Sequence, residues 1–471
     1  MRERPSSPDD LVLDIADLNA AGDGVARTAG MTVSVPFTIP GERVRVRLDR
    51  LRRAGSLRAT LVEVLRPSPH RVAPPCRHFG PDASPGLGPC GGCAWQHIAY
   101  PEQLRLKTET VARLVRAAIG PIPVAPMMAA TPAGDPWGYR HKVHFVFGDG
   151  RRNDIVMGHY ARGSRRIIPV EECPVHDPRG NAAAFTFRDA YQRAGVSGRT
   201  LRGLAIRVGH HTGELMATVV VISEDDKRLR TATRRAVERE SPTALHLNLH
   251  PKPDAFIFGR ETRRLSGTER IREKIGGVSY LVSPTAFFQT NVAAAERLVE
   301  LTLAAIPGGA RVLDLYAGAG LFALALARAG HKVVAVEENR DAVADGEASL
   351  RVNRLDARAC RFIARSAETA IRDLTRRGER FDALVLDPPR DGCAPEVLDE
   401  AFSHLQPQTA VYISCNPAAL GPDLRRIVHH GYQVQSVQPV DMFPHTPHIE
   451  TVVTLKARRG KSTSTAPATA P

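Results

Sequence analysis

Several features that would assign a chain to a class are missing from this sequence. No apolar run approaches the length of a membrane-spanning helix, and Met1 to Pro5 are not followed by the apolar core of a signal peptide. Cysteine is sparse and odd in number, seven in 471 residues, which does not suit a disulfide framework. We therefore expect a cytoplasmic protein with no membrane partner, whose cysteines are free thiols, metal ligands or catalytic groups.

Acidic residues are also in short supply, because 50 Asp and Glu face 64 Lys and Arg, a net charge of +14. This excess suits a polyanionic partner such as nucleic acid, although a coding bias toward arginine accounts for it equally well. A chain of 471 residues is too long for one ordinary core. The sequence therefore predicts a soluble protein of two or three domains.

Residues 10–69 have the pattern of a small β-barrel. Short alternating strands such as Val44–Leu48 are separated by turns that contain glycine. Arg43, Arg45 and Arg47 alternate with apolar residues, so one face is cationic, which favours nucleic-acid binding over a merely solvated strand edge. The segments 1–9 and 458–471 are polar and rich in Pro or Ser, and are predicted to be disordered tails.

The rest of the chain divides into two further predicted domains. Residues 70–275 mix strands and helices without a repeat and are predicted to form a central α/β domain. From 276 to 457 strands and helices alternate regularly, which predicts a doubly wound α/β sheet.

A cofactor-binding turn stands inside this last domain. The buried strand Arg311–Tyr316 runs into Gly318-Ala319-Gly320 and then a helix, and the next strand ends at Glu337, which can accept hydrogen bonds from two ribose hydroxyls. The third glycine of the dinucleotide fingerprint is replaced by Ala323. S-adenosylmethionine (SAM) is therefore favoured over a nicotinamide cofactor.

Two later strands end in residues that carry chemistry. One runs into Asp387-Pro388-Pro389-Arg390, a rigid loop that also occurs in methyltransferases acting on amino nitrogens, and the next ends at Cys415. A thiol beside a SAM turn suits methylation at C5 of uracil, because that carbon becomes nucleophilic only after a thiolate adds to C6. A base must afterwards remove the C5 proton. Cys360 and Cys393 lack this setting and are interpreted as a structural residue and a loop residue.

Four further cysteines form a candidate metal site. Cys90-Gly91-Gly92-Cys93 is preceded by Cys76 and followed at a distance by Cys173. Four thiolates can close a tetrahedral zinc site or hold an iron–sulfur cluster, and the spacing alone does not choose between them.

Three segments carry a resemblance to known proteins: Ser283–Asn291, Tyr412–Pro417 and Asp441–Thr451. With them, the chain resembles the RNA (uracil-C5) methyltransferase family, especially its branch that acts on 23S ribosomal RNA. The resemblance implies a Rossmann-like SAM-dependent methyltransferase fold, an N-terminal OB-like TRAM domain, and a central α/β domain with a [4Fe–4S] cluster. It implies that the cluster ligands are Cys76, Cys90, Cys93 and Cys173.

The resemblance also implies roles for single residues. Cys415 is expected to be the nucleophile and Glu450 the proton-abstracting base. The expected SAM site is lined by Gln289, Tyr316, Gly318, Gly320, Glu337, Ser366 and Asp387. One position departs from the family: Leu321 stands where an asparagine is frequent, which removes a polar contact.

The expected substrate is a uridine in structured RNA, 23S ribosomal RNA in the first place, and the expected state is a monomer. Methylation of transfer RNA at uracil C5 is the rival function within the family. Outside it, the residues leave open methylation of an RNA amino group, in which Cys415 would be incidental, and non-catalytic RNA binding.

Overall fold

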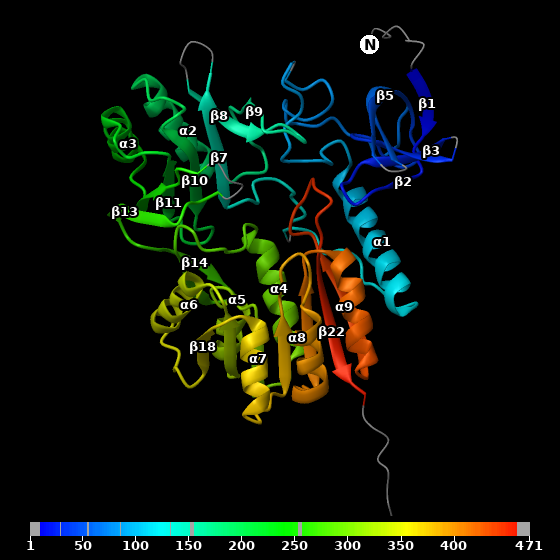
Figure 1. Ribbon diagram of the computed structural model, residues 1–471, viewed down its shortest axis with the longest axis vertical. Helices are drawn as coiled ribbons and strands as arrows, with labels where there is room; N and C mark the ends of the chain where they lie inside the picture. The colour runs from blue at the N-terminus through cyan, green and yellow to red at the C-terminus, as the bar shows by residue number, and fades with distance from the viewer. Residues whose placement is uncertain are drawn as a thin grey trace, which may run out of the picture.

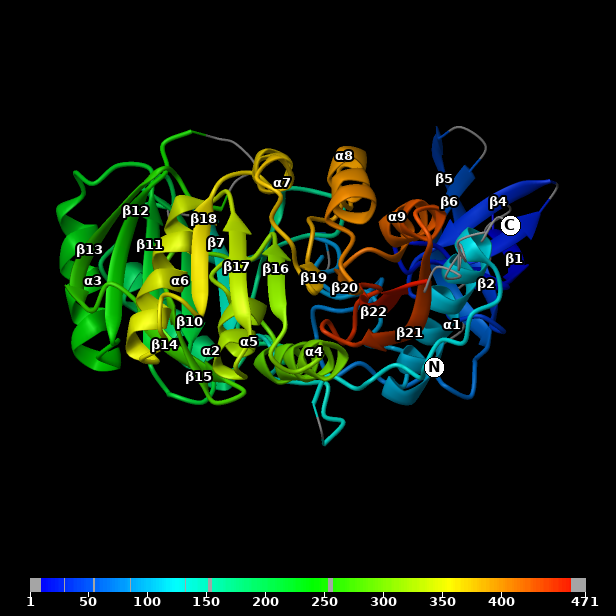
Figure 2. The same cartoon turned by 90° about the horizontal axis from the view of Figure 1, so that it is seen from below.

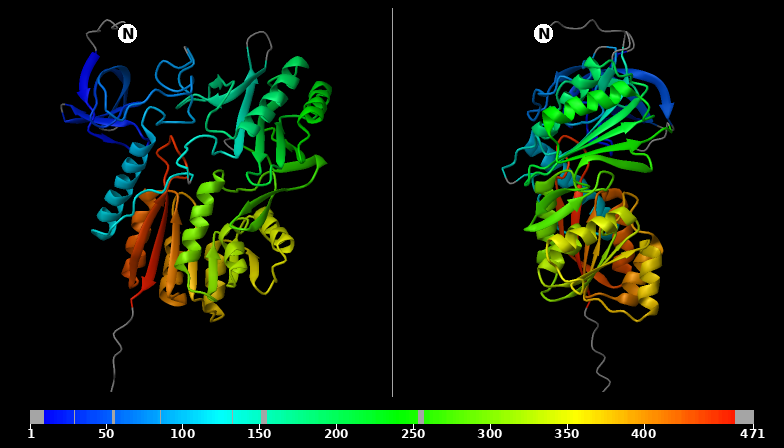
Figure 3. Two further views of the ribbon diagram at one scale, coloured as in Figure 1. Left: turned by 180° about the vertical axis from the view of Figure 1, so that it is seen from behind. Right: turned by 90° about the vertical axis from the view of Figure 1, so that its left-hand side faces the viewer.

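The computed structural model describes residues 10–28, 30–53, 56–84, 86–131, 133–150, 155–252 and 257–458. The predicted disordered tails, 1–9 and 458–471, lie outside these residues except for Arg458. The described chain forms an N-terminal sheet, a central sheet, a two-stranded hairpin and a C-terminal sheet (Figure 1). The central and C-terminal sheets lie one above the other when seen from the side (Figure 3). No helix within the described ranges has the length and apolar character needed to cross a membrane.

The N-terminal sheet has the strand order β1-β5-β6-β4-β3-β2. Its strands are β1 (Asp10–Asp14), β2 (Asp17–Leu18), β3 (Gly24–Thr28), β4 (Met31–Val35), β5 (Arg43–Arg53) and β6 (Ser56–Arg66). Val44 and Val46 of β5 are fully buried, as the alternating pattern predicts. Arg45, which lies between these valines, pairs with Glu63 at 2.5 Å. Arg47, which follows Val46, pairs with Asp10 at 3.2 Å. Part of the predicted cationic face is therefore neutralised within the chain.

The central sheet has the order β13-β12-β11-β10-β7-β8-β9, and β11–β12 is its parallel pair. Its elements are β7 (Lys142–Asp149), β8 (Ile155–Tyr160), β9 (Ile167–Pro169), α2 (Pro178–Arg193), β10 (Leu201–Val208), β11 (Leu215–Val221), α3 (Lys227–Glu240), β12 (Ala244–Leu249) and β13 (Glu261–Gly267). Phe145 of β7, Leu204 of β10 and Phe187 of α2 share one core. The hairpin of β14 (Ile271–Ile275) and β15 (Val278–Val282) leads on to the C-terminal sheet.

The C-terminal sheet has the order β18-β17-β16-β19-β20-β22-β21, in which the first five strands are parallel and β22 runs antiparallel to both of its neighbours, β20 and β21. Alternation along β19 separates two cores: Ala383 and Val385 belong to one, and Leu384 and Leu386 to the other. Figure 2 shows α4 and α5 on one face and α7, α8 and α9 on the opposite face. The elements are α4 (Val292–Ala305), β16 (Arg311–Leu315), α5 (Leu321–Arg328), β17 (Lys332–Glu337), α6 (Arg340–Val352), β18 (Cys360–Ala364), α7 (Ala367–Arg376), β19 (Ala383–Leu386), α8 (Pro395–Asp399), the π-helix Glu400–Leu405, β20 (Thr409–Ser414), α9 (Pro417–His429), β21 (Tyr432–Val440) and β22 (Glu450–Ala457).

Helix α1 (Tyr100–Ile119) lies inside the predicted central domain but packs elsewhere. Figure 1 shows it beside α9. Val111 and Val115 of α1 share a core with Leu420 and Leu424 of α9. This helix therefore extends the layer that covers the C-terminal sheet, a placement that the sequence boundary at 275 did not anticipate.

Candidate active site

The residues singled out by the sequence gather at one edge of the C-terminal sheet. Four neighbouring parallel strands reach this edge in the order β17, β16, β19 and β20. Strand β17 ends at Glu337, and the other three are followed directly by Tyr316, Asp387 and Cys415. Strand β22 runs antiparallel beside β20, with Thr451 opposite Ser414, so its first residue, Glu450, lies at the same edge. Ligands of open α/β sheets bind outside the carboxyl ends of the parallel strands. The topology thus brings a thiol and three carboxyl groups to a single binding edge.

The glycine turn has the backbone expected of a nucleotide-binding loop. Gly318 has a φ of 56° and donates its N–H to Glu337 Oε2 at 2.9 Å. Gly320 has a φ of 86°, and a Cβ there would lie 2.7 Å from the Phe362 ring. Tyr316 is also left-handed, with a φ of 65°, which is strained for a residue with a side chain. Strained backbone at this turn indicates a functional constraint.

The remaining predicted SAM residues have different settings. Gln289 is only 9% exposed and precedes α4. Ser366 caps α7 by accepting the N–H of Thr369 at 3.3 Å. Leu321 is buried in the core, and its carbonyl accepts the Tyr280 hydroxyl at 2.8 Å. The unusual leucine therefore packs inward.

Burial, and for two of the groups the charge of neighbouring carboxylates, perturbs the ionisable groups of the site. Burial raises the pKa of Cys415 to about 11, with further upward contributions from the carboxylates of Glu450 and Asp387. Burial raises the pKa of Asp387 to about 7. The pKa of Glu450 is raised well above its usual range by burial and then by Asp387. Perturbed groups that influence one another in this way are typical of an active site.

Arg390 is a member of the site that the sequence did not single out. Its cation lowers the pKa of both Cys415 and Glu450, which opposes the effect of burial. Its carbonyl accepts the Asn416 side-chain N–H at 2.9 Å, which ties the Asp-Pro-Pro loop to the residue after Cys415. Arg390 directly follows Pro388 and Pro389 in the sequence, and this position was the signal that could have identified it as a site residue.

Cys393 and Cys360 are both buried. The N–H of Cys393 donates to Asp423 Oδ2 at 2.9 Å, and the Tyr412 hydroxyl donates to the same oxygen. Asp423 belongs to α9, so this contact anchors the loop that follows Arg390. Cys393 therefore takes part in supporting the active-site loops through its backbone.

The four cysteines predicted to bind a metal line one cavity of about 520 Å³. The loop that carries Cys90 docks on the central sheet, where Gly91 donates its N–H to Tyr160 O at 2.9 Å. A Cβ on Gly91 would lie 3.0 Å from that oxygen, so glycine permits the close approach. Burial raises the pKa of Cys173, and charge on Cys93, Cys90 and Cys76 raises it further, which reflects the proximity of the four thiols. The donor set fits a thiolate-bound metal centre.

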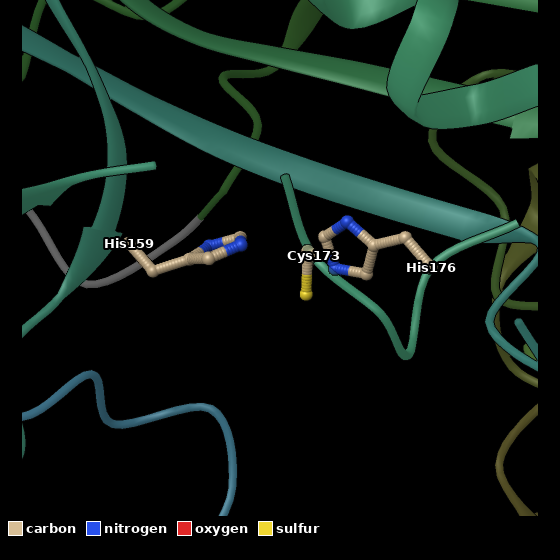
Figure 4. Close-up of side chains that lie close together, drawn as sticks. All are labelled: His159, Cys173 and His176. Carbon is tan, nitrogen blue, oxygen red and sulfur yellow. The ribbon is translucent and has the colours of Figure 1, made fainter. Parts of the chain in front are cut away.

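Two histidines add to this cavity. In Figure 4 the rings of His159 and His176 lie on either side of the Cys173 side chain. Their nitrogens and the Cys173 sulfur all lie within 4.8 Å of one another. His159 Nε2 and His176 Nδ1 have no hydrogen-bond partner within the described part of the chain. The sequence analysis did not identify these histidines.

Two family profiles match the chain. The profile described as tRNA (Uracil-5-)-methyltransferase covers residues 267–458, and that of the TRAM domain covers residues 11–62.

Curated relatives match over nearly the whole length. An uncharacterized RNA methyltransferase of Gloeobacter violaceus is 36% identical over 95% of this chain and 96% of its own. Another, of Halalkalibacterium halodurans, is 32% identical over 97% and 99%. Among solved structures, the tRNA (uracil-54, C5)-methyltransferase of Pyrococcus abyssi in complex with S-adenosyl-L-homocysteine has a TM-score of 0.74 and 26% identity, covering 94% of this chain and 99% of that one.

Proposed function

This chain belongs to the tRNA (uracil-5-)-methyltransferase family and is a SAM-dependent RNA (uracil-C5) methyltransferase with an N-terminal TRAM domain, and we propose that it methylates 23S ribosomal RNA. The TRAM domain together with the cysteine site supports the ribosomal branch of the resemblance. Transfer RNA is the second candidate, favoured by the similarity to the Pyrococcus abyssi tRNA enzyme. Mass-spectrometric mapping of 5-methyluridine in ribosomal and transfer RNA, from cells with and without the gene, separates the two.

Cys415 is the proposed nucleophile and Glu450 the proposed base. The observation that carries this assignment is their position on neighbouring strands at one edge, each perturbed by the other charges there. The Cys415 thiolate adds to C6 of uracil, and C5 then attacks the SAM methyl group and releases S-adenosylhomocysteine. Glu450 removes the C5 proton, the C5=C6 double bond re-forms, and the thiolate leaves.

The SAM site proposed from the sequence comprises Gln289, Tyr316, Gly318, Gly320, Glu337, Ser366 and Asp387. Glu337 has one oxygen engaged by Gly318, and its other oxygen accepts the Asn339 N–H at 2.8 Å. The carboxylate of Glu337 would therefore accept hydrogen bonds from the ribose hydroxyls of SAM on the lone pairs that these two contacts leave free. The Ser366 side chain already caps α7, so it would contact SAM while keeping that hydrogen bond.

RNA carrying 5-fluorouridine at the target position tests the mechanism. After methyl transfer from SAM, C5 of this base carries fluorine where uracil carries a proton. Fluorine cannot leave as a proton does, so with SAM present the wild-type enzyme should remain covalently joined to this RNA. Cys415→Ala should form no adduct and transfer no methyl group. Retained methylation by Cys415→Ala would instead support the methylation of an amino group.

The target base must leave its stack to reach the half-buried Cys415 thiol. Phe287 is 70% exposed beside the predicted SAM residue Gln289, a large solvated aromatic next to the site. We infer that it stacks on RNA bases near the target. Phe287→Ala should weaken RNA binding without changing the binding of SAM.

The cysteine cavity is proposed to hold a [4Fe–4S] cluster on Cys76, Cys90, Cys93 and Cys173. Such a cluster would crosslink distant segments, and methyl transfer itself needs no electron, so the role is structural. Zinc on a mixed cysteine and histidine set is the alternative that His159 and His176 favour. Iron, sulfide and zinc analysis of the purified protein decides between them. The monomeric state and the cytoplasmic location remain predictions.

A further inference from the structure

The loop that delivers Glu450 is held by distant parts of the chain. It runs from Asp441 to Ile449, between β21 and β22, and Figure 1 shows it rising from the C-terminal sheet toward the N-terminal half. Its partners come from α1, from the segment after Cys93 and from Tyr139, whose hydroxyl donates to Pro444 O at 3.1 Å. Because Glu450 begins the strand that follows, its position depends on what fixes this loop.

A buried ion pair fixes the start of the loop. Lys107 Nζ of α1 lies 2.6 Å from Asp441 Oδ1 and donates to Phe443 O at 3.1 Å. The side chains of Lys107 and Asp441 are both completely buried. An isolated buried charge is strongly disfavoured, so the pair is satisfied only while α1 and the loop stay together.

A buried amide fixes the middle of the loop. Gln103, one turn before Lys107, accepts the N–H of His445 at 2.8 Å and donates to Ile98 O at 2.8 Å. The Trp137 ring stacks on the His445 ring with centroids 3.8 Å apart. His445 has a φ of 63°, a strained conformation that persists only where its surroundings impose it.

The same point of the loop is joined to the four-cysteine site. Ala94 and Trp95 follow Cys93 directly, and both donate their N–H groups to His445 O at 2.9 Å. A ligand held at Cys93 therefore restrains the two backbone donors that hold His445. Five residues further on, the chain reaches Glu450.

We propose that Gln103 and Lys107 are positioning residues that clamp the 441–449 loop and so hold Glu450 for proton abstraction, with the four-cysteine site anchoring the clamp through Ala94 and Trp95. The inference rests on the proposed function. Cys415 directly follows β20 and lies outside the loop, so addition to C6 and methyl transfer do not depend on the clamp. After methyl transfer C5 carries a methyl group and a proton. Glu450 accepts that proton, the C–H electron pair becomes the C5=C6 bond, and the S–C6 bond breaks to return the Cys415 thiolate.

A misplaced base should therefore trap the enzyme on its own substrate. The test uses full-length enzyme, SAM and an ordinary in vitro transcript of the host's 23S ribosomal RNA. Lys107→Met should transfer methyl in a single turnover within about twofold of wild type but release product at least about tenfold more slowly. A denaturation-resistant, methylated protein–RNA adduct should accumulate, as it should with Glu450→Gln.

Because Lys107→Met leaves Asp441 unpaired and can impair folding, the double variant Lys107→Met/Asp441→Leu, which removes both charges, is measured beside it. Arg270→Met is the matched control, since it removes the ion-pair partner, 2.5 Å away, of the buried Asp345 carboxylate, which lies on α6 outside the 441–449 loop and keeps the Ser283 N–H as a donor. The control should form no adduct. The proposed clamp is refuted if the double variant releases product at the wild-type rate. It is also refuted if the rate of adduct formation falls by the same factor as the rate of turnover. Failure of the wild type to form an adduct with 5-fluorouridine RNA overturns the proposed function instead.

Hydrogen exchange tests the anchor without using activity. Cys93→Ser in the full chain should speed amide exchange across 441–449 relative to wild type. Cys360→Ser, a buried cysteine of β18 outside the site, should leave that exchange unchanged. Equal exchange in Cys93→Ser and wild type would refute the anchor.

Discussion

The pH dependence of adduct formation follows from the environment of Cys415. With its pKa raised to about 11, the thiolate fraction at about pH 8 is roughly one in a thousand, against roughly a quarter for a free cysteine. Adduct formation with saturating 5-fluorouridine RNA should therefore rise about tenfold per pH unit, with no plateau below about pH 9. Bound RNA excludes further water from the thiol and acts in the same direction.

Arg390 offers the sharper perturbation. Its cation favours the thiolate, so Arg390→Gln should slow adduct formation at every pH while leaving the slope unchanged. Each unit by which the pKa rises costs about tenfold in rate at fixed pH. Arg372→Gln, on the exposed face of α7, is the control and should match wild type. The assay is quenched-flow gel analysis. A plateau near pH 8.5, or an unchanged rate in Arg390→Gln, would refute the conclusion that burial and neighbouring carboxylates keep this thiol protonated.

Three further substitutions probe the pocket. Asp387→Asn should raise the Tm by a few degrees at about pH 8 but not at about pH 4. Burial raises the pKa of Asp387 in the folded state to about 7, so folding binds a proton between the unfolded-state and folded-state pKa values. The stability of the wild type therefore falls as pH rises through this range, and the asparagine variant escapes that loss. Gly320→Ala should destabilise the protein by more than the ~1–2 kcal/mol of a left-handed backbone, because its Cβ would meet Phe362, and SAM affinity measured by calorimetry should fall. Leu321→Asn should cost about 2–4 kcal/mol in denaturant unfolding without improving SAM affinity, because the side chain faces the core.

The strand-end residues were predictable because parallel strands place their carboxyl ends at one edge. Regular alternation of strands and helices was enough to assign Glu337, Tyr316, Asp387 and Cys415 to that edge. The prediction that the chain is a multidomain α/β RNA (uracil-C5) methyltransferase with a TRAM domain is confirmed by the comparisons.

Long-range packing was not predictable from local patterns. Lys107 and Asp441 are 334 positions apart, and each alone has the appearance of an ordinary surface charge in the sequence. The packing of α1 against α9 likewise depends on apolar residues that would suit any helix interface. Arg45 and Arg47 were correctly placed on one face, but their partners Glu63 and Asp10 come from other strands. Only the folded chain reveals which charges meet.

The strand order also gives the proposed reaction a direction. Moving across the sheet from β17 to β22, the proposed ribose ligand Glu337 comes first, then the glycine turn after β16, then Asp387, then Cys415 and Glu450. SAM would thus occupy the β17–β16 side and uracil the β20–β22 side, so the methyl group passes over the end of β19. There the carboxylates of Asp387 and Glu450 raise the pKa of Cys415, and Asp387 raises that of Glu450, whereas a bound sulfonium cation would act in the opposite direction by favouring the ionised forms. Exchange of the uracil C5 hydrogen with solvent follows addition at C6 without methyl transfer. A cationic SAM analogue with no transferable methyl group should therefore speed this exchange, whereas S-adenosylhomocysteine, which lacks the positive charge, should not.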